Sequence, residues 1–438
     1  MGRSIASSWS KLVGSNVVGG AMQFIAVAIA ARALSLEAFG MIVLIQTYAK
    51  VVDALLNFQS VNVLTHFLAD AQERDDRSRF AGLLKAGLLV DLGTALFATV
   101  LAAALLPVLA PVFGLAEEWI APGMLFCLVI LTRIFGVTEA YLRCHDRFWL
   151  VGARPVLAAG LTAGGSLFLW LAGADARAFL LLWMLAEVMA NLFFIGATWH
   201  AIRRDSASAA EPSSAREAIA ASAGFWPMMW QTNATTGIRM LTQDIDVLFA
   251  GSVFGPTGAS LLRVAKSLAN QVGQLARALQ QVVSAPISRM VTRGDLRAVT
   301  RYSTRVAMLA GGGGLALATV MFAVGQPILV AAFGSEFAPA YWLTVLLFTS
   351  RGVYLAGVTL LPTMLALDIS GLYLRSVILG TLAFGVVLAI AVPAFGLAGI
   401  AISHIVFEVV WFAACWLAIH QRVAGRGLHS LTTARGSS

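Results

Sequence analysis

Charged residues are scarce in this chain of 438 residues, where Asp, Glu, Lys and Arg together make up 12% and hydrophobic residues make up 59%. A soluble protein with this composition would lack the polar side chains needed to cover its surface. The balance excludes a soluble globular domain and predicts an all-α polytopic membrane protein.

Several kinds of chemical site are also missing. The three cysteines, Cys127, Cys144 and Cys415, show neither metal-binding nor disulfide spacing. The glycine run at 311–314 lacks the Lys-Ser or Lys-Thr of a phosphate-binding loop, so we expect it to allow close helix packing. The loops predicted on the outer side are too short for a catalytic domain. We therefore predict that the protein is no enzyme and has no cofactor. Because no ATP-binding motif is visible, we expect any energy that it uses to come from an H⁺ or Na⁺ gradient, the membrane potential or removal of its product.

Apolar stretches long enough to cross roughly 30 Å of hydrocarbon as helices recur along the whole chain. We predict twelve membrane-spanning helices, at residues 12–32, 39–69, 82–106, 120–142, 153–172, 178–200, 219–251, 258–288, 303–324, 339–366, 373–392 and 397–419.

The net charge of +8 is distributed in a way that argues against a nucleic-acid partner. Of the 30 Lys and Arg residues, 21 lie at ends and loops on one predicted side, seven lie within spans, and only Arg32 and Arg177 lie on the other side. By the positive-inside rule this split predicts twelve spans with both termini cytoplasmic. Cleavage of residues 3–31 as a signal peptide would break the alternation, so we expect an uncleaved first helix.

The two halves of the chain repeat each other at an offset of 220 residues. The offset carries Gln46 to Lys266, Asn57 to Arg277 and Phe113-Gly114 to Phe333-Gly334; after small length changes, Arg133 matches Arg351 and Glu187 matches Glu408. Because six is an even number of spans, the repeats are parallel and related by a pseudo-two-fold axis along the membrane normal. We predict an N-terminal six-helix lobe at 1–202, a cytoplasmic linker at 203–218, a C-terminal six-helix lobe at 219–421 and a cytoplasmic tail at 422–438.

Two polar stripes occupy matching places in these lobes. Side chains three and four apart share one helical face, and polar ones recur at these steps twice: at Gln46, Lys50, Asp53, Asn57 and Ser60, and at Lys266, Asn270, Gln274, Arg277, Gln281, Ser284 and Ser288. Polar faces are costly against lipid, so we expect both stripes to face a polar cavity between the lobes. Gln46, Asn57, Asn270, Gln274 and Gln281 are the predicted cavity-lining residues.

The second stripe favours an anionic ligand. Residues 258–288 contain Arg263, Lys266 and Arg277 but no Asp or Glu, and Arg and Lys bind phosphate groups by charge-assisted hydrogen bonds. Together with Lys50 they form the predicted anion-binding set. The alternative is that intramembrane charges only pair and hold helices together, as Lys50 and Asp53 could do one turn apart.

Asp53, Glu139 and Asp246 are the predicted candidates for proton or sodium coupling. All three lie within predicted spans, where carboxylates are expensive.

Several stretches resemble the Wzx-type polysaccharide flippases of the MOP (multidrug/oligosaccharidyl-lipid/polysaccharide) exporter superfamily. They are ARALSLEAFGMIVLIQTYAKVVDALLNFQS at 31–60, QDIDVLFAGSVFGPTGASLLRVAKSLANQV at 243–272, Pro286 followed by Gly294-Asp295, and PAFGLAGIAISHIVFEV at 393–409. The resemblance implies a MOP/MATE-like fold of two bundles in the bacterial inner membrane.

The resemblance also implies a function. Such a protein would flip undecaprenyl-pyrophosphate-linked oligosaccharide from the cytoplasmic to the periplasmic leaflet, for O-antigen or exopolysaccharide synthesis, beside polymerase and assembly proteins. A drug or cation antiporter of the same superfamily is the first alternative, although a cation site should favour carboxylates over basic residues. A membrane glycan polymerase or ligase is the second.

Overall fold

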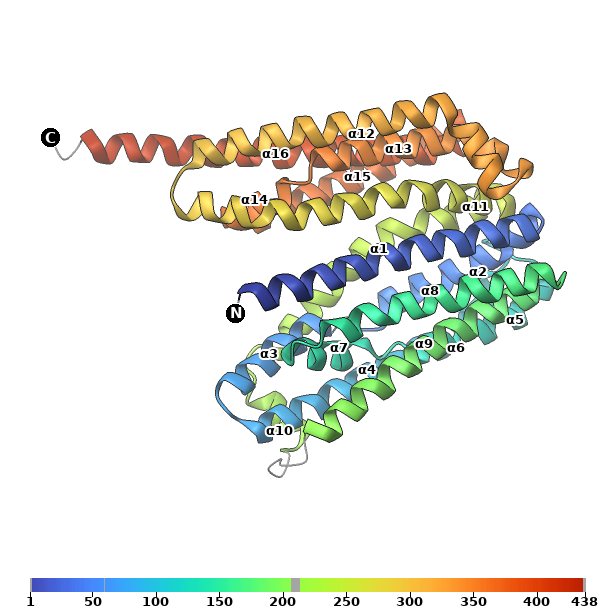
Figure 1. Ribbon diagram of the computed structural model, residues 1–438, viewed down its shortest axis with the longest axis horizontal. Helices are drawn as coiled ribbons and strands as arrows, with labels where there is room; N and C mark the ends of the chain where they lie inside the picture. Colours follow the sequence, from blue (N-terminus) through green and yellow to red (C-terminus); the bar gives the residue numbers. More distant parts are fainter. Residues whose placement is uncertain (1, 59, 206–212, 436–438) are drawn as a thin grey trace. The chain divides into compact units, whose positions relative to one another are not determined.

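The computed structural model describes the backbone of residues 2–58, 60–205 and 213–435, which form helices and turns and contain no strand (Figure 1). Ten of the helical segments are long and apolar enough to cross a membrane. The predicted all-α polytopic class is confirmed. Contacts between residues divide the chain into two compact units, Met1–Ser260 and Leu261–Ser438.

The first unit contains α1 (Gly2–Ala33), α2 (Leu36–Leu56), α3 (Val61–Glu73), α4 (Arg77–Leu109), η1 (Glu117–Trp119), α5 (Ile120–Phe126), α6 (Leu128–Leu131), α7 (Phe135–Cys144), α8 (Phe148–Leu171), α9 (Ala176–Asp205), α10 (Ala215–Ala220) and the start of α11 (Phe225–Thr292). The second unit contains the rest of α11, then α12 (Leu296–Phe333), η3 (Ser335–Ala340), α13 (Tyr341–Ala356), α14 (Leu360–Ala366), α15 (Ser370–Phe395) and α16 (Ala398–Arg435).

The boundary between the units falls later than the predicted linker. The predicted spans 219–251 and 258–288 are the two parts of α11, which is interrupted by non-helical dihedrals at Gly255. The second part of the predicted linker, with α10, packs on α4, where Ser213 donates a hydrogen bond from its Oγ to the Ser78 carbonyl at 3.0 Å. Residues up to Ser260 therefore belong to the first unit. Residues 206–212 of the linker and 436–438 of the tail lie outside the described residues.

Three spans predicted as continuous helices are broken. The span at 39–69 is interrupted between the end of α2 at Leu56 and the start of α3 at Val61, the span at 120–142 at 132–134, and the span at 339–366 at 357–359. At the first break, the Phe58 N–H and the Asn57 side-chain oxygen both hydrogen-bond to Thr94 Oγ1 on α4. Such side-chain partners replace the lost helical bonds, and a hydropathy pattern does not reveal them.

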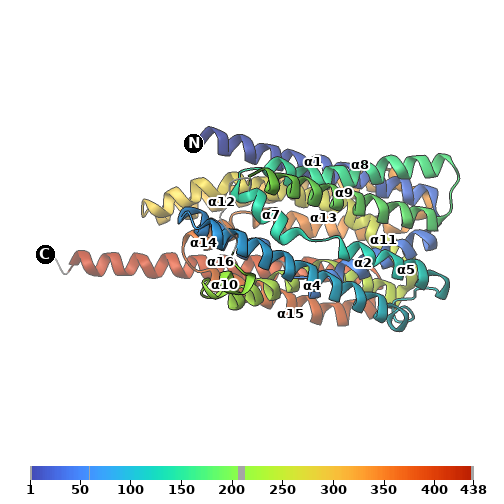
Figure 2. The same cartoon turned by 90° about the horizontal axis from the view of Figure 1, so that it is seen from below.

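Small residues let helices approach closely within each unit. In the first, α1 lies beside α8 (Figures 1 and 2), and Gly19 faces the Pro155 carbonyl carbon at a distance, 3.5 Å from its Cβ position, that is an ordinary van der Waals contact. In the second, α12 packs on α13, where a Cβ built on Gly314 would lie 2.5 Å from Cα of Gly352. The expected packing role of the 311–314 run is confirmed at Gly314.

The turns at the two ends of the helices use different residues. The predicted outer turns place glycines at positive φ: Gly114, Gly173, Gly255, Gly334 and Gly396. The predicted inner turns place Asp75, Asp146 and Asp368 there, and Gly294 in the α11–α12 turn. Asp tolerates the left-handed region better than most residues because its short side chain can bond locally.

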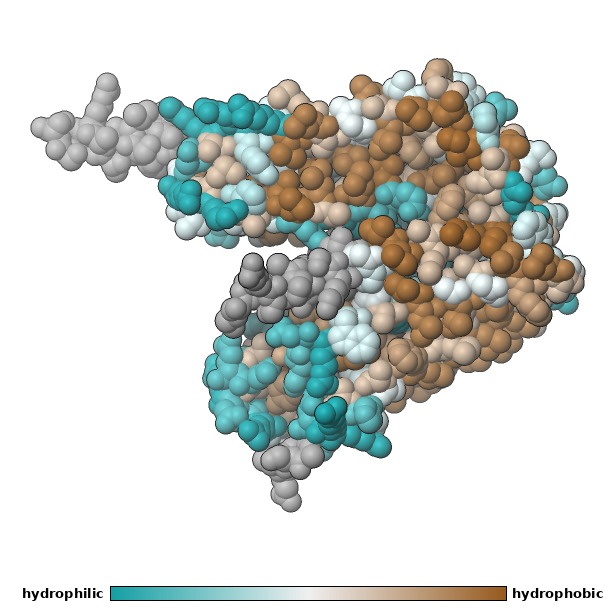
Figure 3. All heavy atoms as spheres, viewed as in Figure 1, coloured by the Kyte–Doolittle hydropathy of each residue, from teal (hydrophilic) through white to brown (hydrophobic). Residues whose placement is uncertain are grey.

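The surface fits a bilayer in each unit taken separately. Apolar residues cover the middle stretches of the helices, and hydrophilic residues gather at the α3–α4 turn and at the start of α12 (Figure 3). Large side chains such as Phe168 and Leu309 are 70% and 79% exposed. Long outward-facing apolar surfaces of this kind are what hydrocarbon contact requires.

Gly40 provides a test of the close packing at the outer end. A Cβ at Gly40 would lie 2.0 Å from the Pro256 carbonyl oxygen, so Gly40→Ala must push α2 away from the turn at Gly255. We expect the substitution to lower the free energy of unfolding by about 1–3 kcal/mol, the usual cost of overpacking. The unfolding temperature in detergent would measure this loss. Gly93→Ala is the matched control, because nothing lies within 4 Å of its Cβ position. Equal stability of the two variants would contradict this packing.

Asp70 predicts a pH dependence of stability at the inner end. Burial acts to raise its pKa, but hydrogen bonds from Arg74 and Arg79 at 2.8 and 2.9 Å outweigh burial and hold the pKa below its ordinary value. The stabilisation is therefore present above the unfolded-state pKa of about 3.9 and is lost as the pH falls through the lower folded-state value.

We expect Asp70→Asn to lower the unfolding temperature at pH 7 and to make little difference at strongly acidic pH. Asp75→Asn, which removes an 85% exposed carboxylate, serves as the control and should change little at either pH. A loss in Asp70→Asn that does not depend on pH would rule out the proposed electrostatic origin.

Candidate functional site

Arg133 lies in the break between α6 and α7 and binds two carboxylates. Its Nη1 donates to Asp53 Oδ2 of α2 at 2.8 Å, and its Nε donates to Glu187 Oε1 of α9 at 3.1 Å, a bond that Nη2 reinforces. The three side chains are only 11–27% exposed. We call Asp53, Arg133 and Glu187 the charge triad; it joins three elements of the first unit inside an apolar bundle.

Neutral side chains complete the hydrogen bonding of the triad. Asn57 donates to Asp53 Oδ1 at 3.0 Å and to the Arg133 carbonyl at 3.2 Å, while Thr94 Oγ1 donates to the Asn57 amide oxygen at 3.0 Å. The network satisfies both the buried charges and the carbonyl that the helix break leaves open. A buried ion pair offsets its desolvation only when its remaining polar atoms are bonded in this way.

Asp91 of α4 holds the adjoining helix ends. It accepts hydrogen bonds from the Ser60 hydroxyl and from the Val137 N–H, the latter at 2.8 Å. Gly136 makes this approach possible, because a Cβ there would lie 2.6 Å from Asp91 Oδ1. Asp91 therefore fixes the starts of α3 and α7, which flank the two breaks beside the triad.

The second unit contains the same Arg–Glu pair with weaker bonding. Arg351 of α13 donates from Nη1 to Glu408 Oε1 of α16 at 3.4 Å. Within the part of the chain that the structure describes, Arg351 Nε and Glu408 Oε2 are buried without a hydrogen-bond partner. The residue 220 positions after Asp53 is Gly273, so the repeat does not supply a second carboxylate here.

Lys50 has a different partner from the expected one. Its Nζ lies 2.8 Å from Asp244 Oδ2 on α11, so the predicted pairing of Lys50 with Asp53 is wrong. Asp53 instead faces Arg133, which offers a buried guanidinium. The Lys50 side chain is 47% exposed, and Asp244 partly offsets its charge.

The other predicted residues differ in burial. Asn57 and Lys266 are buried, Gln46, Arg263 and Gln274 are half-buried, and Asn270, Arg277 and Gln281 are exposed. Of the coupling candidates, Asp53 belongs to the charge triad, Glu139 pairs with Arg143 one turn along α7, and Asp246 is fully buried.

Arg154 is a charged residue near the start of α8 that the sequence pattern does not single out. It lies inside α8, half-buried, with its guanidinium carbon 4.1 Å above the ring centre of Phe135. Its Nη1 donates to Asn191 Oδ1 at 3.2 Å. No Asp or Glu of the described chain lies within salt-bridge distance of Arg154. Arg154 differs from an ordinary loop arginine because the start of α8 is partly buried, and a hydropathy pattern does not reveal that burial.

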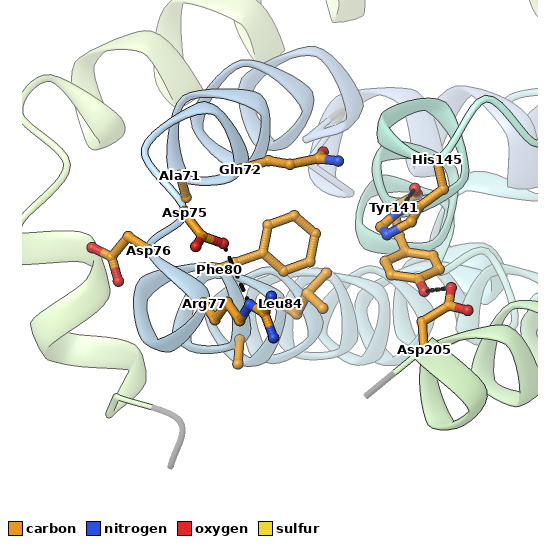
Figure 4. A pocket seen from close by; sticks show the side chains of 11 residues that line it. Ala71, Gln72, Asp75, Asp76, Arg77, Phe80, Leu84, Tyr141, His145 and Asp205 are labelled. Atoms are coloured by element: carbon orange, nitrogen blue, oxygen red, sulfur yellow. Dashed lines mark hydrogen bonds and ion pairs between the residues drawn. The ribbon is translucent and has the colours of Figure 1, made fainter. Parts of the chain in front are cut away.

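A pocket of about 360 Å³ opens at the predicted inner end of the first unit (Figure 4). Phe80 separates Asp75 and Arg77 on one side from Tyr141 and Asp205 on the other. Several charged side chains that line the pocket form ion pairs or hydrogen bonds with other residues. Asp75 pairs with Arg77, and Asp205 accepts a hydrogen bond from Tyr141 and pairs with Arg147 at 2.9 Å. The described residues also contain no group of three His, Cys, Asp or Glu side chains that could hold a metal ion.

The charge triad predicts that replacing Arg133 destabilises the protein more than replacing Arg351. Arg133→Gln would leave two buried carboxylates without a cation, which should cost on the order of 3–5 kcal/mol. Arg351→Gln is the matched control and should cost less, because it breaks a single 3.4 Å contact. Unfolding temperatures in detergent would measure both. A larger loss for Arg351→Gln would contradict the assignment of the triad as the stronger network.

No model of a known protein family matches the chain. The inner membrane protein YghQ of Escherichia coli (strain K12) is 25% identical over 342 residues, which cover 77% of this chain and 95% of that protein. A multidrug resistance MATE family transporter of the MOP superfamily, in an inward-facing conformation, superposes with a TM-score of 0.70, at 15% identity, over 93% of this chain and 95% of its own.

Two further solved structures also superpose on the chain. The lipid II flippase MurJ superposes with a TM-score of 0.69, at 12% identity, over 96% of this chain and 90% of its own. The Vibrio cholerae MATE transporter VcmN gives 0.63, at 14% identity, over 96% of both chains. The expected MOP/MATE-like fold is confirmed: the chain has the fold that transporters of the MOP superfamily share.

Proposed function

We propose that the protein is a flippase that carries a lipid-linked oligosaccharide across the bacterial inner membrane by alternating access, from the cytoplasmic to the periplasmic leaflet. The substrate we propose is the undecaprenyl-pyrophosphate-linked form, used in O-antigen or exopolysaccharide synthesis alongside polymerase and assembly proteins. The similarity to an inner membrane protein supports the location, and the MurJ-like fold supports a lipid-linked substrate.

The charge of residues 258–288 carries the proposal. This part of α11 holds Arg263, Lys266 and Arg277 and no carboxylate, so it has a net positive charge of three within a segment apolar enough to span the membrane. A pyrophosphate would offset that charge and accept several charge-assisted hydrogen bonds. Lys50 contributes less than expected, because Asp244 already pairs with it.

Arg154 joins the proposed anion-binding set. Its direct contacts to Phe135 and Asn191 are neutral, and no carboxylate of the described chain forms an ion pair with it. An arginine stacked on a ring keeps further N–H donors in a fixed plane, which suits a phosphate.

A drug or cation antiporter is the second candidate, because MATE transporters superpose as well as the flippase does. The bonding of the carboxylates argues against it. Asp53 and Glu187 share Arg133, and Glu139 pairs with Arg143. A cationic drug would have to displace these arginines from their partners.

Neutralisation of Lys266 and Arg277 tests the flippase proposal. Lys266→Gln and Arg277→Gln should each slow flipping of a lipid-linked glycan in proteoliposomes by about 10- to 100-fold, the range expected for a lost charge-assisted hydrogen bond. Arg375→Gln, an exposed cation on α15, is the control. Full activity of both test variants, at equal protein levels, would refute the anion site. Efflux of organic cations from a drug-sensitive host, without glycan flipping, would favour the antiporter.

A further inference from the structure

Glu408 is a buried carboxyl group with incomplete bonding. Its side chain is 5% exposed, its Oε1 has a single 3.4 Å contact with Arg351, and its Oε2 has no partner. Arg351 Nε is equally without a partner. Burying a charged carboxylate is expensive unless its oxygens are hydrogen-bonded, so the ionised pair is poorly compensated.

The equivalent pair in the first unit shows what full compensation looks like. Glu187 receives two N–H donors from Arg133, and Asp53 accepts a third, with Asn57 bonded to Asp53. The same two residue types, placed by the same internal repeat, thus have a complete network in one unit and an incomplete one in the other.

We propose that Glu408 is a proton-binding site of the transport cycle, which exchanges between a carboxylate paired with Arg351 and a neutral carboxylic acid. Uptake of one proton by a carboxylate oxygen removes the buried negative charge. It also releases the Arg351 guanidinium from its ionic partner, and the 21% exposure of the Arg351 side chain leaves it open to another anion. The inference concerns coupling and does not depend on the identity of the transported molecule.

Few other titratable side chains near Glu408 could bind the proton in its place. His404 lies one turn earlier on α16, buried, with its ring 5.0 Å from Phe384 of α15. Tyr354 of α13 and Tyr373 of α15 both contact Trp411, one turn after Glu408. The remaining charges on the elements that pack against α16 are basic: Arg375 on α15, and Arg297, Arg301 and Arg305 on α12.

A proton suits this site better than a metal ion. Sodium requires several oxygen ligands, and an arginine beside the carboxylate repels a second cation. Glu408 is not part of any group of three potential metal-ligating side chains in the described chain. Protonation needs only the one oxygen that is without a partner.

Infrared difference spectroscopy during a pH titration of the purified full-length protein provides the direct test. We expect a protonated-carboxyl C=O band in the wild type that is lost in Glu408→Gln and retained in Glu187→Gln, the matched residue of the first unit. Glu408→Asp should restore a band at a shifted position. Retention of the complete wild-type band in Glu408→Gln, or loss of the band on adding Na⁺ at constant pH, would overturn the proposal.

Transport gives a second readout. The flipping rate of the wild type should change at least tenfold between acidic and neutral pH, and Glu408→Gln should lose that dependence. Because the spectroscopic test needs no substrate, its result stands even if the glycan proves to be the wrong one. A Glu408→Gln protein that keeps the wild-type pH profile would show that the residue is structural.

Discussion

The first unit is organised around the need to compensate one buried guanidinium. Arg133 cannot lose its proton, so a bundle that encloses it must bring acceptors to it from several helices. Asp53 comes from α2 and Glu187 from α9, and the broken backbone supplies a carbonyl for Asn57. The breaks in the second and fourth spans are therefore part of the same arrangement as the charges. A straight helix at either place would leave no open carbonyl beside the arginine.

Internal duplication gave both units the same Arg–Glu pair, but the surroundings have diverged. Gly273 stands where the repeat would place a counterpart of Asp53, and Arg277 stands at the position of Asn57. The charge triad of the first unit is thus completely hydrogen-bonded, whereas the second unit has an incompletely bonded carboxyl group.

The sequence was a good guide to helices and a poor one to their breaks. Hydropathy and charge placed the spans, and the 220-residue offset correctly identified Arg351 and Glu408 as counterparts of Arg133 and Glu187, which then proved to pair. The breaks after Leu56 and at 132–134 were missed because side chains of distant helices stabilise them. Lys50 was given the wrong partner because nearness along one helix was the only geometry the sequence offered, and Asp244 is almost 200 residues away.

The aspartates at positive φ in the predicted inner turns have an effect beyond backbone geometry. Asp75 lies between Arg74 and Arg77, and Asp146 precedes Arg147. In each of these two turns the negative charge of the aspartate partly offsets the positive charge of the arginines. Glycine would allow the same turn yet leave the arginines to attract anionic lipid headgroups without opposition. The choice of aspartate thus lets the chain keep arginines at these turns while weakening its adhesion to an anionic membrane surface.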